Sequence, residues 1–352
     1  MKLIKDYKFL NNVIGWLVFI AASIVYLMTI EPTTSWWDCG EYIATSYKLQ
    51  VGHPPGAPFF QLLGRFFTLF AFGDVTQVAK MVNAMSAILS GLTILFTFWT
   101  ITAIAKKFFL KDSEMSMGQK ITVLGAGLVG AMAFTFSDSF WFSAVEGEVY
   151  ATSSMFTAAV VWAMMKWEAA ADSKHHLRWI ILIAFLMGLS VGVHLLNLLT
   201  IPALTYVYYF KKYKFSAKGF ILTGIISILI LGFVQSGVIP WIVKLAGAFE
   251  LFFVNSVGMP FNSGTIIYFV LLLGLIVLGL YLTRKKAKVV LNTVILAFAF
   301  ILIGYSSFFM LVIRANANTP INENAPKDAI SLLGYLNRDQ YGDWPVDRKS
   351  VV

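Results

Sequence analysis

This chain of 352 residues is 58% hydrophobic and only 13% charged, which excludes an ordinary soluble globular protein, because soluble domains carry about 25% charged residues. Its formal charge of +9 does not point to a nucleic-acid partner, since Lys and Arg accumulate in the cytoplasmic loops of membrane proteins. A single cysteine, Cys39, excludes a disulfide within the chain and argues against a cysteine-based zinc site.

Long apolar runs predict an all-α polytopic membrane protein with about nine transmembrane helices, each of which needs roughly 20 apolar residues. The predicted spans are 13–30, 77–103, 121–137, 149–165, 179–194, 195–210, 219–240, 265–283 and 289–313. The first has no small-residue cleavage site after it, so we expect a retained anchor. This pattern predicts a transmembrane domain, 1–313, followed by an outer-side tail, 314–352.

The distribution of basic residues predicts the orientation. Only 32 residues separate Arg178 from Lys211, which is short for two spans and long for one. With two spans, the basic clusters within 2–8, 106–120, 166–178, 211–218 and 284–288 all fall on one side, as the positive-inside rule requires. We therefore expect a cytoplasmic N-terminus and a periplasmic C-terminus in a bacterial inner membrane.

The first outer segment, 31–73, combines acidic residues with a rigid turn. Asp38 and Glu41 are three residues apart, so on a helix both carboxylates lie on one face. A turn that cannot be helix interior follows at His53, because two prolines and a glycine come next. The run 59–72 is too short to span and predicts a helix lying in the interface. Ionisable groups at membrane depth are typically functional, so this segment is our first candidate site.

The later outer segments add further candidates. Glu146 and Glu148 lie among aromatic residues before the fourth span, and His194 lies at the outer end of the fifth. Arg314 and Asn316 open the tail. Residues 125–130 match G-x-G-x-x-G, but they lie inside a predicted span, where small residues allow close helix packing instead of binding a dinucleotide.

The stretches WWDCGEY (36–42) and GHPPGAP (52–58) resemble the first outer loop of a bacterial and animal membrane family related to the GT-C superfamily of glycosyltransferases. This family includes an O-mannosyltransferase that acts on plexins. Supporting similarities are FWFSAVEGEVYATSSMF (140–156), GLSVGVHLLNLL (188–199) and RANANTP (314–320). The resemblance implies a GT-C-like fold with Asp38 at the catalytic centre and Glu41 in the same motif. Bacterial relatives continue into a soluble outer region, so we expect the tail to be the truncated start of one.

The expected function is therefore transfer of a hexose, with mannose the first candidate, from a polyprenyl-phosphate carrier to Ser or Thr hydroxyls of exported proteins. Asp38 would accept the hydroxyl proton, while Arg314 with His53 or His194 would bind the departing phosphate. Glu41, Glu146 and Glu148 would hold the acceptor or a divalent cation. No metal is assigned, because no ligand pattern demands one.

Three alternatives remain open at this stage. A GT-C enzyme that glycosylates a lipid or a glycan would have the same sequence features. A transporter would place charged residues within the spans and break helices in two matching halves. A non-enzymatic membrane subunit would have no need for the cluster around Asp38.

Overall fold

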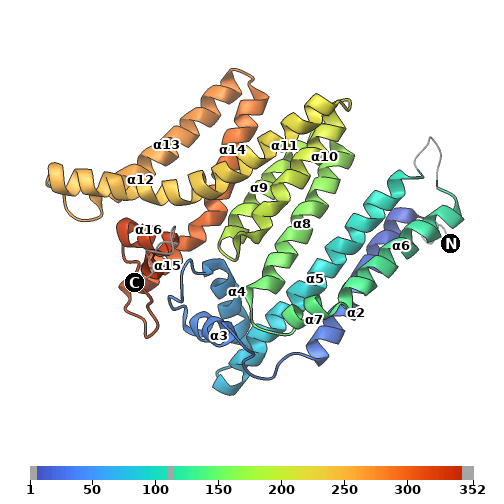
Figure 1. Cartoon of the computed structure of the whole chain (residues 1–352), viewed down its shortest axis with the longest axis horizontal. Helices are drawn as coiled ribbons and strands as arrows, with labels where there is room; N and C mark the ends of the chain where they lie inside the picture. Colours follow the sequence, from blue (N-terminus) through green and yellow to red (C-terminus); the bar gives the residue numbers. More distant parts are fainter. Residues whose placement is uncertain (1–5, 110–114, 343–352) are drawn as a thin grey trace, which may run out of the picture.

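The computed structural model describes residues 6–109 and 115–342, and within these ranges the chain folds into helices with no β-strand (Figure 1). The expected all-α class is therefore confirmed. The α-helices are α2 (Tyr7–Met28), α3 (Cys39–Lys48), α4 (Pro58–Thr68), α5 (Val78–Lys107), α6 (Met117–Thr135), α7 (Asp138–Ala144), α8 (Val149–Ala170), α9 (Leu177–Val191), α10 (Ile201–Lys212), α11 (Ala217–Gly232), α12 (Ile239–Leu251), α13 (Ser263–Lys285), α14 (Val289–Tyr305), α15 (Phe309–Asn316) and α16 (Ala329–Asn337).

Six helical segments of the described chain are long and apolar enough to cross a bilayer. They are Tyr7–Met28, Val75–Lys107, Met117–Thr135, Ala217–Ser256, Ser263–Lys285 and Val289–Asn316. The other three predicted spans coincide with α8, with the shorter α9, and with α10 and the 3₁₀ turn before it. The polytopic class is thus confirmed, whereas the number nine stays a prediction.

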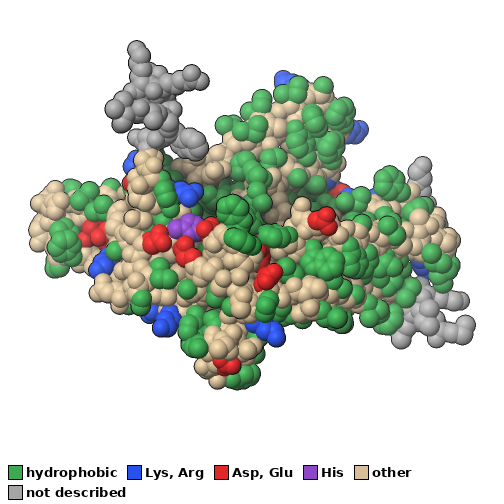
Figure 2. All heavy atoms as spheres, turned by 60° about the horizontal axis from the view of Figure 1, so that its bottom comes forward, with side chains coloured by type: hydrophobic (Ala, Val, Ile, Leu, Met, Phe, Trp, Pro, Cys, Tyr) green, Lys and Arg blue, Asp and Glu red, His purple; other side chains and the backbone are tan. Residues whose placement is uncertain are grey.

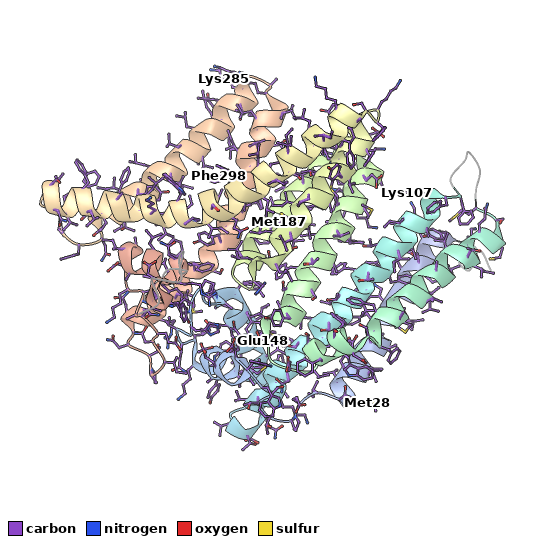
Figure 3. The ribbon with its side chains drawn as sticks, in the orientation of Figure 1. Met28, Lys107, Glu148, Met187, Lys285 and Phe298 are labelled. Carbon is purple, nitrogen blue, oxygen red and sulfur yellow. The ribbon has the colours of Figure 1, made fainter. Side chains whose placement is uncertain are left out.

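The basic loops gather at one end of the molecule, which we call the basic end. Figure 3 shows Lys107 and Lys285 at this end and Met28 and Glu148 toward the other. Lys212 Nζ donates to the Ala171 carbonyl at 3.2 Å, so the chain leaves this end through α9 and returns to it through α10. This agrees with two passes between Arg178 and Lys211. Lys2, Lys5 and Lys111, which belong to the predicted basic clusters, lie outside the described residues.

The predicted span 219–240 is only part of a longer helical segment, Ala217–Ser256. Pro240 stands at the predicted end of this span, and proline lacks the N–H that would bond to the fourth residue before it. In the structure a π-helical turn, Phe233–Val238, lies directly before that proline, and α12 continues beyond it. At 1.5 Å per residue the whole segment is about 60 Å long, roughly twice the hydrocarbon thickness of a bilayer. α12 therefore runs on beyond the bundle and covers α16 (Figure 1).

Two glycines allow neighbouring helices to approach closely, one against side chains and one against a backbone. A Cβ at Gly127 in α6 would clash with Thr102 and Phe98 of α5, and one at Gly188 in α9 would clash with the backbone of Ile301 in α14. Gly127 and Gly130 of the 125–130 pattern thus pack against α5, whereas a Cβ at Gly125 would have no atom within 4 Å. These close contacts give the bundle a rigid frame for the shorter helices.

α3 and α4 lie between α5 and α15, away from the basic end (Figure 1). The backbone N–H groups of Phe59 and Phe60 both donate to the Gly192 carbonyl, at 2.7 and 3.3 Å. This attaches the start of α4 to the end of α9. The helix predicted over 59–72 is present as α4 and a 3₁₀ turn, Leu69–Ala71, whereas its place in the membrane interface stays a prediction.

Candidate active site

Asp38 and Glu41 lie at the start of α3. Asp38 is the N-cap residue, and its carbonyl accepts a hydrogen bond from the Tyr42 N–H at 2.9 Å. The spacing of three residues brings both carboxylates to the same side of the helix, as predicted. α3 ends at Leu49, which adopts a left-handed conformation with φ of 48°, and the chain then turns back toward Asp38.

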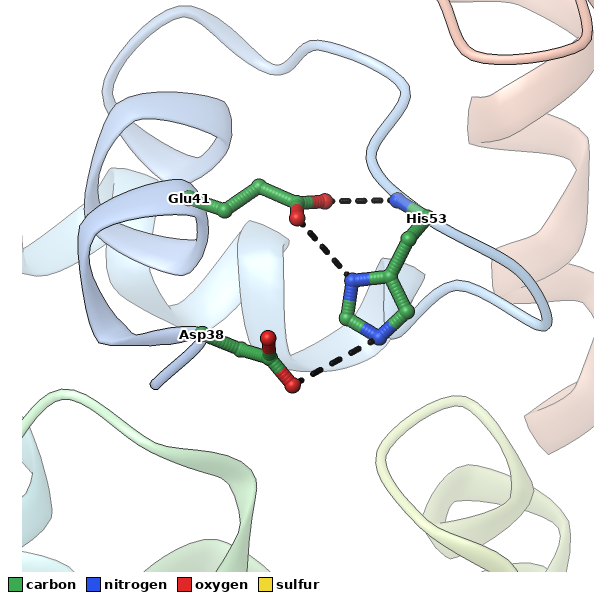
Figure 4. Close-up of side chains that lie close together, drawn as sticks. All are labelled: Asp38, Glu41 and His53. Carbon is green, nitrogen blue, oxygen red and sulfur yellow. Dashed lines mark hydrogen bonds and ion pairs between the residues drawn. The ribbon is translucent and has the colours of Figure 1, made fainter. Parts of the chain in front are cut away.

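His53 completes the group of three side chains in Figure 4. Its carbonyl accepts a hydrogen bond from the Gly56 N–H at 2.9 Å, which closes the predicted turn. Its backbone N–H donates to Glu41 Oε1 at 2.5 Å, and its Nδ1 lies 3.0 Å from Glu41 Oε2. The Nε2 atom lies 3.8 Å from Asp38 Oδ2, which is too long for a hydrogen bond. Glu41 therefore fixes the imidazole, and Nε2 faces Asp38.

The contacts between Glu41 and His53 shift the pKa values of both side chains. The hydrogen bond from Glu41 raises the pKa of His53 above its ordinary value; burial opposes this shift, and the charges of Glu41, Asp38 and Glu323 add to it. Burial by itself would raise the pKa of Glu41, but the two hydrogen bonds from His53 and its charge outweigh burial and lower it. An imidazolium bound to a carboxylate is the state that these shifts favour.

Two further acidic residues of the site, Glu146 and Glu148, lie in the segment between α7 and α8, and we call this pair the acidic wall. Glu146 and Glu148 are 4% and 6% exposed, so both carboxyl groups are buried. Glu148 caps α8, and its Oε1 accepts from the Val149 N–H at 3.0 Å. Its Oε2 lies 3.9 Å from the Cys39 sulfur, whereas the Oε2 atom of Glu146 has no hydrogen-bond partner among the described residues. The two glutamates thus face the beginning of α3.

The burial of this wall changes its chemistry. Burial raises the pKa of Glu148 to about 7, against the Val149 hydrogen bond and with the help of the charges of Asp38 and Glu146. Burial and the two neighbouring glutamates raise the pKa of the Cys39 thiol to about 12. The thiol is therefore protonated at neutral pH and is not a nucleophile, whereas Glu148 exchanges its proton near neutrality.

The tail after α15 binds to the first outer segment. Val51 N–H donates to the Ile321 carbonyl at 3.1 Å, and Glu323 N–H donates to the Val51 carbonyl at 3.0 Å. The buried Tyr335 hydroxyl of α16 donates to the carbonyls of Gly52 and His53, at 2.6 and 3.2 Å. The predicted domain boundary at 313/314 falls inside α15, and the tail forms part of the site. Figure 2 shows a histidine among acidic side chains on the molecular surface.

The remaining predicted residues have backbone partners. Arg314 donates to the Leu49 and Lys48 carbonyls, at 2.5 and 3.1 Å, and so holds the end of α3. The Asn316 side chain donates to two backbone carbonyls of its own region. His194 Nδ1 accepts from the Leu196 N–H at 3.1 Å. Phosphate binding by Arg314 or His194 stays a prediction, as does substrate binding by Asn316, and the contacts of Arg314 favour a positioning role.

Asp38, Glu41 and His53 also form the one group among the described residues that offers three possible metal ligands, whose ligand atoms lie within 4.8 Å of one another. Two carboxylates and an imidazole suit a divalent cation such as Mn²⁺ or Zn²⁺. However, the imidazole lies between the carboxylates and is already hydrogen-bonded to one of them (Figure 4). The same three residues form an ion-paired site without any metal.

Sequence reasoning missed Tyr42, Glu323 and Tyr335. The Tyr42 ring lies 5.7 Å from the His53 ring between centroids, and the charges of Asp38, Glu41 and Glu148 all act on its hydroxyl. Its position directly after Glu41 in the sequence could have indicated that it belongs to the site. Glu323 and Tyr335 carried no such signal, because each is more than 250 residues from the loop that it contacts.

Comparison with known proteins places this site at the start of a matching region. The family described as "Protein O-mannosyl-transferase TMEM260 N-terminal domain" matches residues 38–217. The chain is 30% identical over 145 residues to protein O-mannosyl-transferase tmem260 of Dictyostelium discoideum, which covers 41% of this chain and 16% of that protein.

A mammalian relative gives a similar result. Identity to protein O-mannosyl-transferase TMEM260 of Mus musculus is 28% over 175 residues, or 49% of this chain and 22% of that protein. The chain thus spans less than a quarter of the length of these curated relatives. No solved structure matches it.

Proposed function

We propose, from the premise that this chain belongs to the protein O-mannosyl-transferase TMEM260 N-terminal domain family, that it transfers mannose from a polyprenyl-phosphate carrier to Ser or Thr hydroxyls of exported proteins. The observation that carries the proposal is the group of Asp38, Glu41 and His53, in which the exposed Asp38 carboxylate lies 3.8 Å from an imidazole that Glu41 holds. The site would face the periplasm, with the basic end in the cytoplasm, as the positive-inside rule favours.

Asp38 is the residue that we assign as general base. Its carboxylate is exposed and receives no side-chain hydrogen bond from the described residues, so an incoming hydroxyl can reach it. As the hydroxyl oxygen attacks the anomeric carbon, its proton passes to Asp38 and the bond from that carbon to the phosphate oxygen breaks. The electron pair of that bond leaves with the polyprenyl phosphate. A base within hydrogen-bond reach typically contributes about 10²- to 10⁴-fold to the rate.

His53 is the group that we assign to the departing phosphate. Glu41 holds its Nδ1 side at 3.0 Å, so a proton on Nε2 points toward Asp38 and the space beside it. A protonated imidazole is a charge-assisted donor to phosphate oxygens. In this scheme Glu41 is a positioning residue, because it acts on the reaction through the ring that it holds.

The acidic wall is the part of the site that would meet the acceptor. Glu146 Oε2 is buried and has no hydrogen-bond partner within the described part of the chain, and such an atom can accept a hydrogen bond from a Ser, Thr or backbone donor. Trp36 and Trp37 are 79% and 89% exposed beside Asp38. Exposed tryptophans favour the membrane interface, where a polyprenyl chain in the bilayer could present its sugar phosphate to Asp38.

A reconstituted transfer assay tests this assignment. The wild-type chain and Asp38→Asn would be placed in liposomes with polyprenyl-phosphate mannose and a Ser/Thr-rich peptide, and the mannosylated peptide would be measured by mass spectrometry. Asp138→Asn is the matched control, because Asp138 is an exposed aspartate at the start of α7. We expect a loss of about 10²-fold or more for Asp38→Asn only. Full transfer by this variant would remove Asp38 from the mechanism, and transfer from a nucleotide sugar alone would remove the lipid carrier.

A further inference from the structure

A cavity of about 340 Å³ lies at the basic end, between the start of α9, the end of α13 and the start of α14. It is remote from the candidate active site, since Lys285 and Glu148 lie toward opposite ends of the bundle (Figure 3). Both α13 and α14 belong to segments able to cross a bilayer. The cavity therefore opens where these helices leave the hydrocarbon region, at the depth of lipid headgroups.

Two arginines give the cavity its charge. Arg178 and Arg284 both line it, and within residues 6–109 and 115–342 neither one forms an ion pair with an acidic side chain. By contrast, Lys107 and Lys211 at the same end are paired with Glu168 and Asp172. Two guanidinium groups left without a counter-charge beside one cavity attract an anion, and guanidinium matches the geometry of phosphate.

The other residues that line the cavity indicate which further groups a ligand would have. Ile181 and Leu296 provide apolar wall, and Asn292 and Thr293 provide polar groups. Asn292 Nδ2 donates to the Leu280 carbonyl and to Thr283 Oγ1, at 3.1 and 2.9 Å. These bonds tie α14 to α13 and fix the shape of the cavity. A ligand with a phosphate at one end and hydrocarbon at the other fits this lining.

We propose that this cavity binds an anionic phospholipid, with its headgroup phosphate between Arg178 and Arg284 and an acyl chain along Ile181 and Leu296. Basic pockets between transmembrane helices on the cytoplasmic side commonly bind such headgroups. The site is independent of the proposed transfer reaction, because no residue of the candidate active site lines it.

The test measures lipid binding on the purified chain in detergent by native mass spectrometry and by the shift in Tm. The probes are phosphatidylglycerol, phosphatidylcholine and inorganic phosphate. We expect phosphatidylglycerol to bind and to raise the Tm, with little effect of the other two. Because each basic residue near a membrane surface contributes about 1 kcal/mol, the double variant Arg178→Gln/Arg284→Gln should bind about 30-fold more weakly, at about 1.4 kcal/mol per tenfold.

Two further variants keep the proposal falsifiable. Lys214→Gln/Lys218→Gln removes the same charge from two exposed positions, one before and one in the first turn of α11 at the same end, and should leave binding unchanged. Thr293→Phe fills the cavity without changing charge and should weaken binding even if the arginine variant folds poorly. Equal losses in the lysine control, equal binding of phosphatidylcholine, protection by inorganic phosphate alone, or full binding by Thr293→Phe would each overturn the proposal.

Discussion

Replacing Glu148 by Gln should change how stability depends on pH. Burial raises the pKa of Glu148 in the folded chain from 4.5 to about 7. At 1.36 kcal/mol per pH unit, the shift corresponds to about 3 kcal/mol. Below pH 4.5 the residue is protonated whether the chain is folded or unfolded. Between pH 4.5 and 7 the unfolded chain loses this proton while the folded chain keeps it, so stability falls as pH rises and levels off above 7.

The glutamine side chain of this variant has no proton to lose, so folding does not oppose its ionisation at high pH. It can still accept the hydrogen bond from Val149. We therefore expect Glu148→Gln to be more stable than wild type by up to about 3 kcal/mol at pH 8 and equally stable near pH 4. Thermal unfolding followed by tryptophan fluorescence at pH 4 to 8 measures the difference. Glu31→Gln, an exposed position outside the buried wall, is the control. A gain that is equal at pH 4 and pH 8, or no gain at pH 8, would refute the reasoning from burial.

Other substitutions test the contacts of the site and of the bundle. The proposed reaction needs a protonated His53, so transfer should fall as pH rises through the pKa of His53. Glu41→Gln removes the partner that raises this pKa, so the fall should begin at a lower pH in the variant; an unchanged pH–rate profile would contradict this role. Tyr335→Phe removes two hydrogen bonds to the loop and should cost about 1–3 kcal/mol, visible as a lower Tm. Gly188→Leu pushes α9 from the Ile301 backbone. Such overpacking should lower the free energy of unfolding by about 1–3 kcal/mol, and the Tm with it; an unchanged Tm would show that these helices can separate freely.

Some features of the site followed from sequence alone. The spacing of Asp38 and Glu41 placed both carboxylates on one helical face, and the prolines after His53 demanded a turn, because both depend on backbone geometry over a few residues. The placement of the basic clusters at one end also followed, because an even number of apolar segments between two clusters brings both to the same side. The limits of these rules appeared at the predicted end of the span 219–240, because the helical segment continues through Pro240 as far as Ser256.

Only the tertiary structure decided which distant groups meet. It placed Glu148 against Cys39, turned Arg314 to the carbonyls at the end of α3, and brought Tyr335 to the loop that carries His53. These contacts join residues 109 to 283 positions apart, and no periodicity or spacing encodes them. They arise because packed helices bring buried polar groups together, and each buried donor or acceptor must find a partner there or lose the hydrogen bonds that it makes in water.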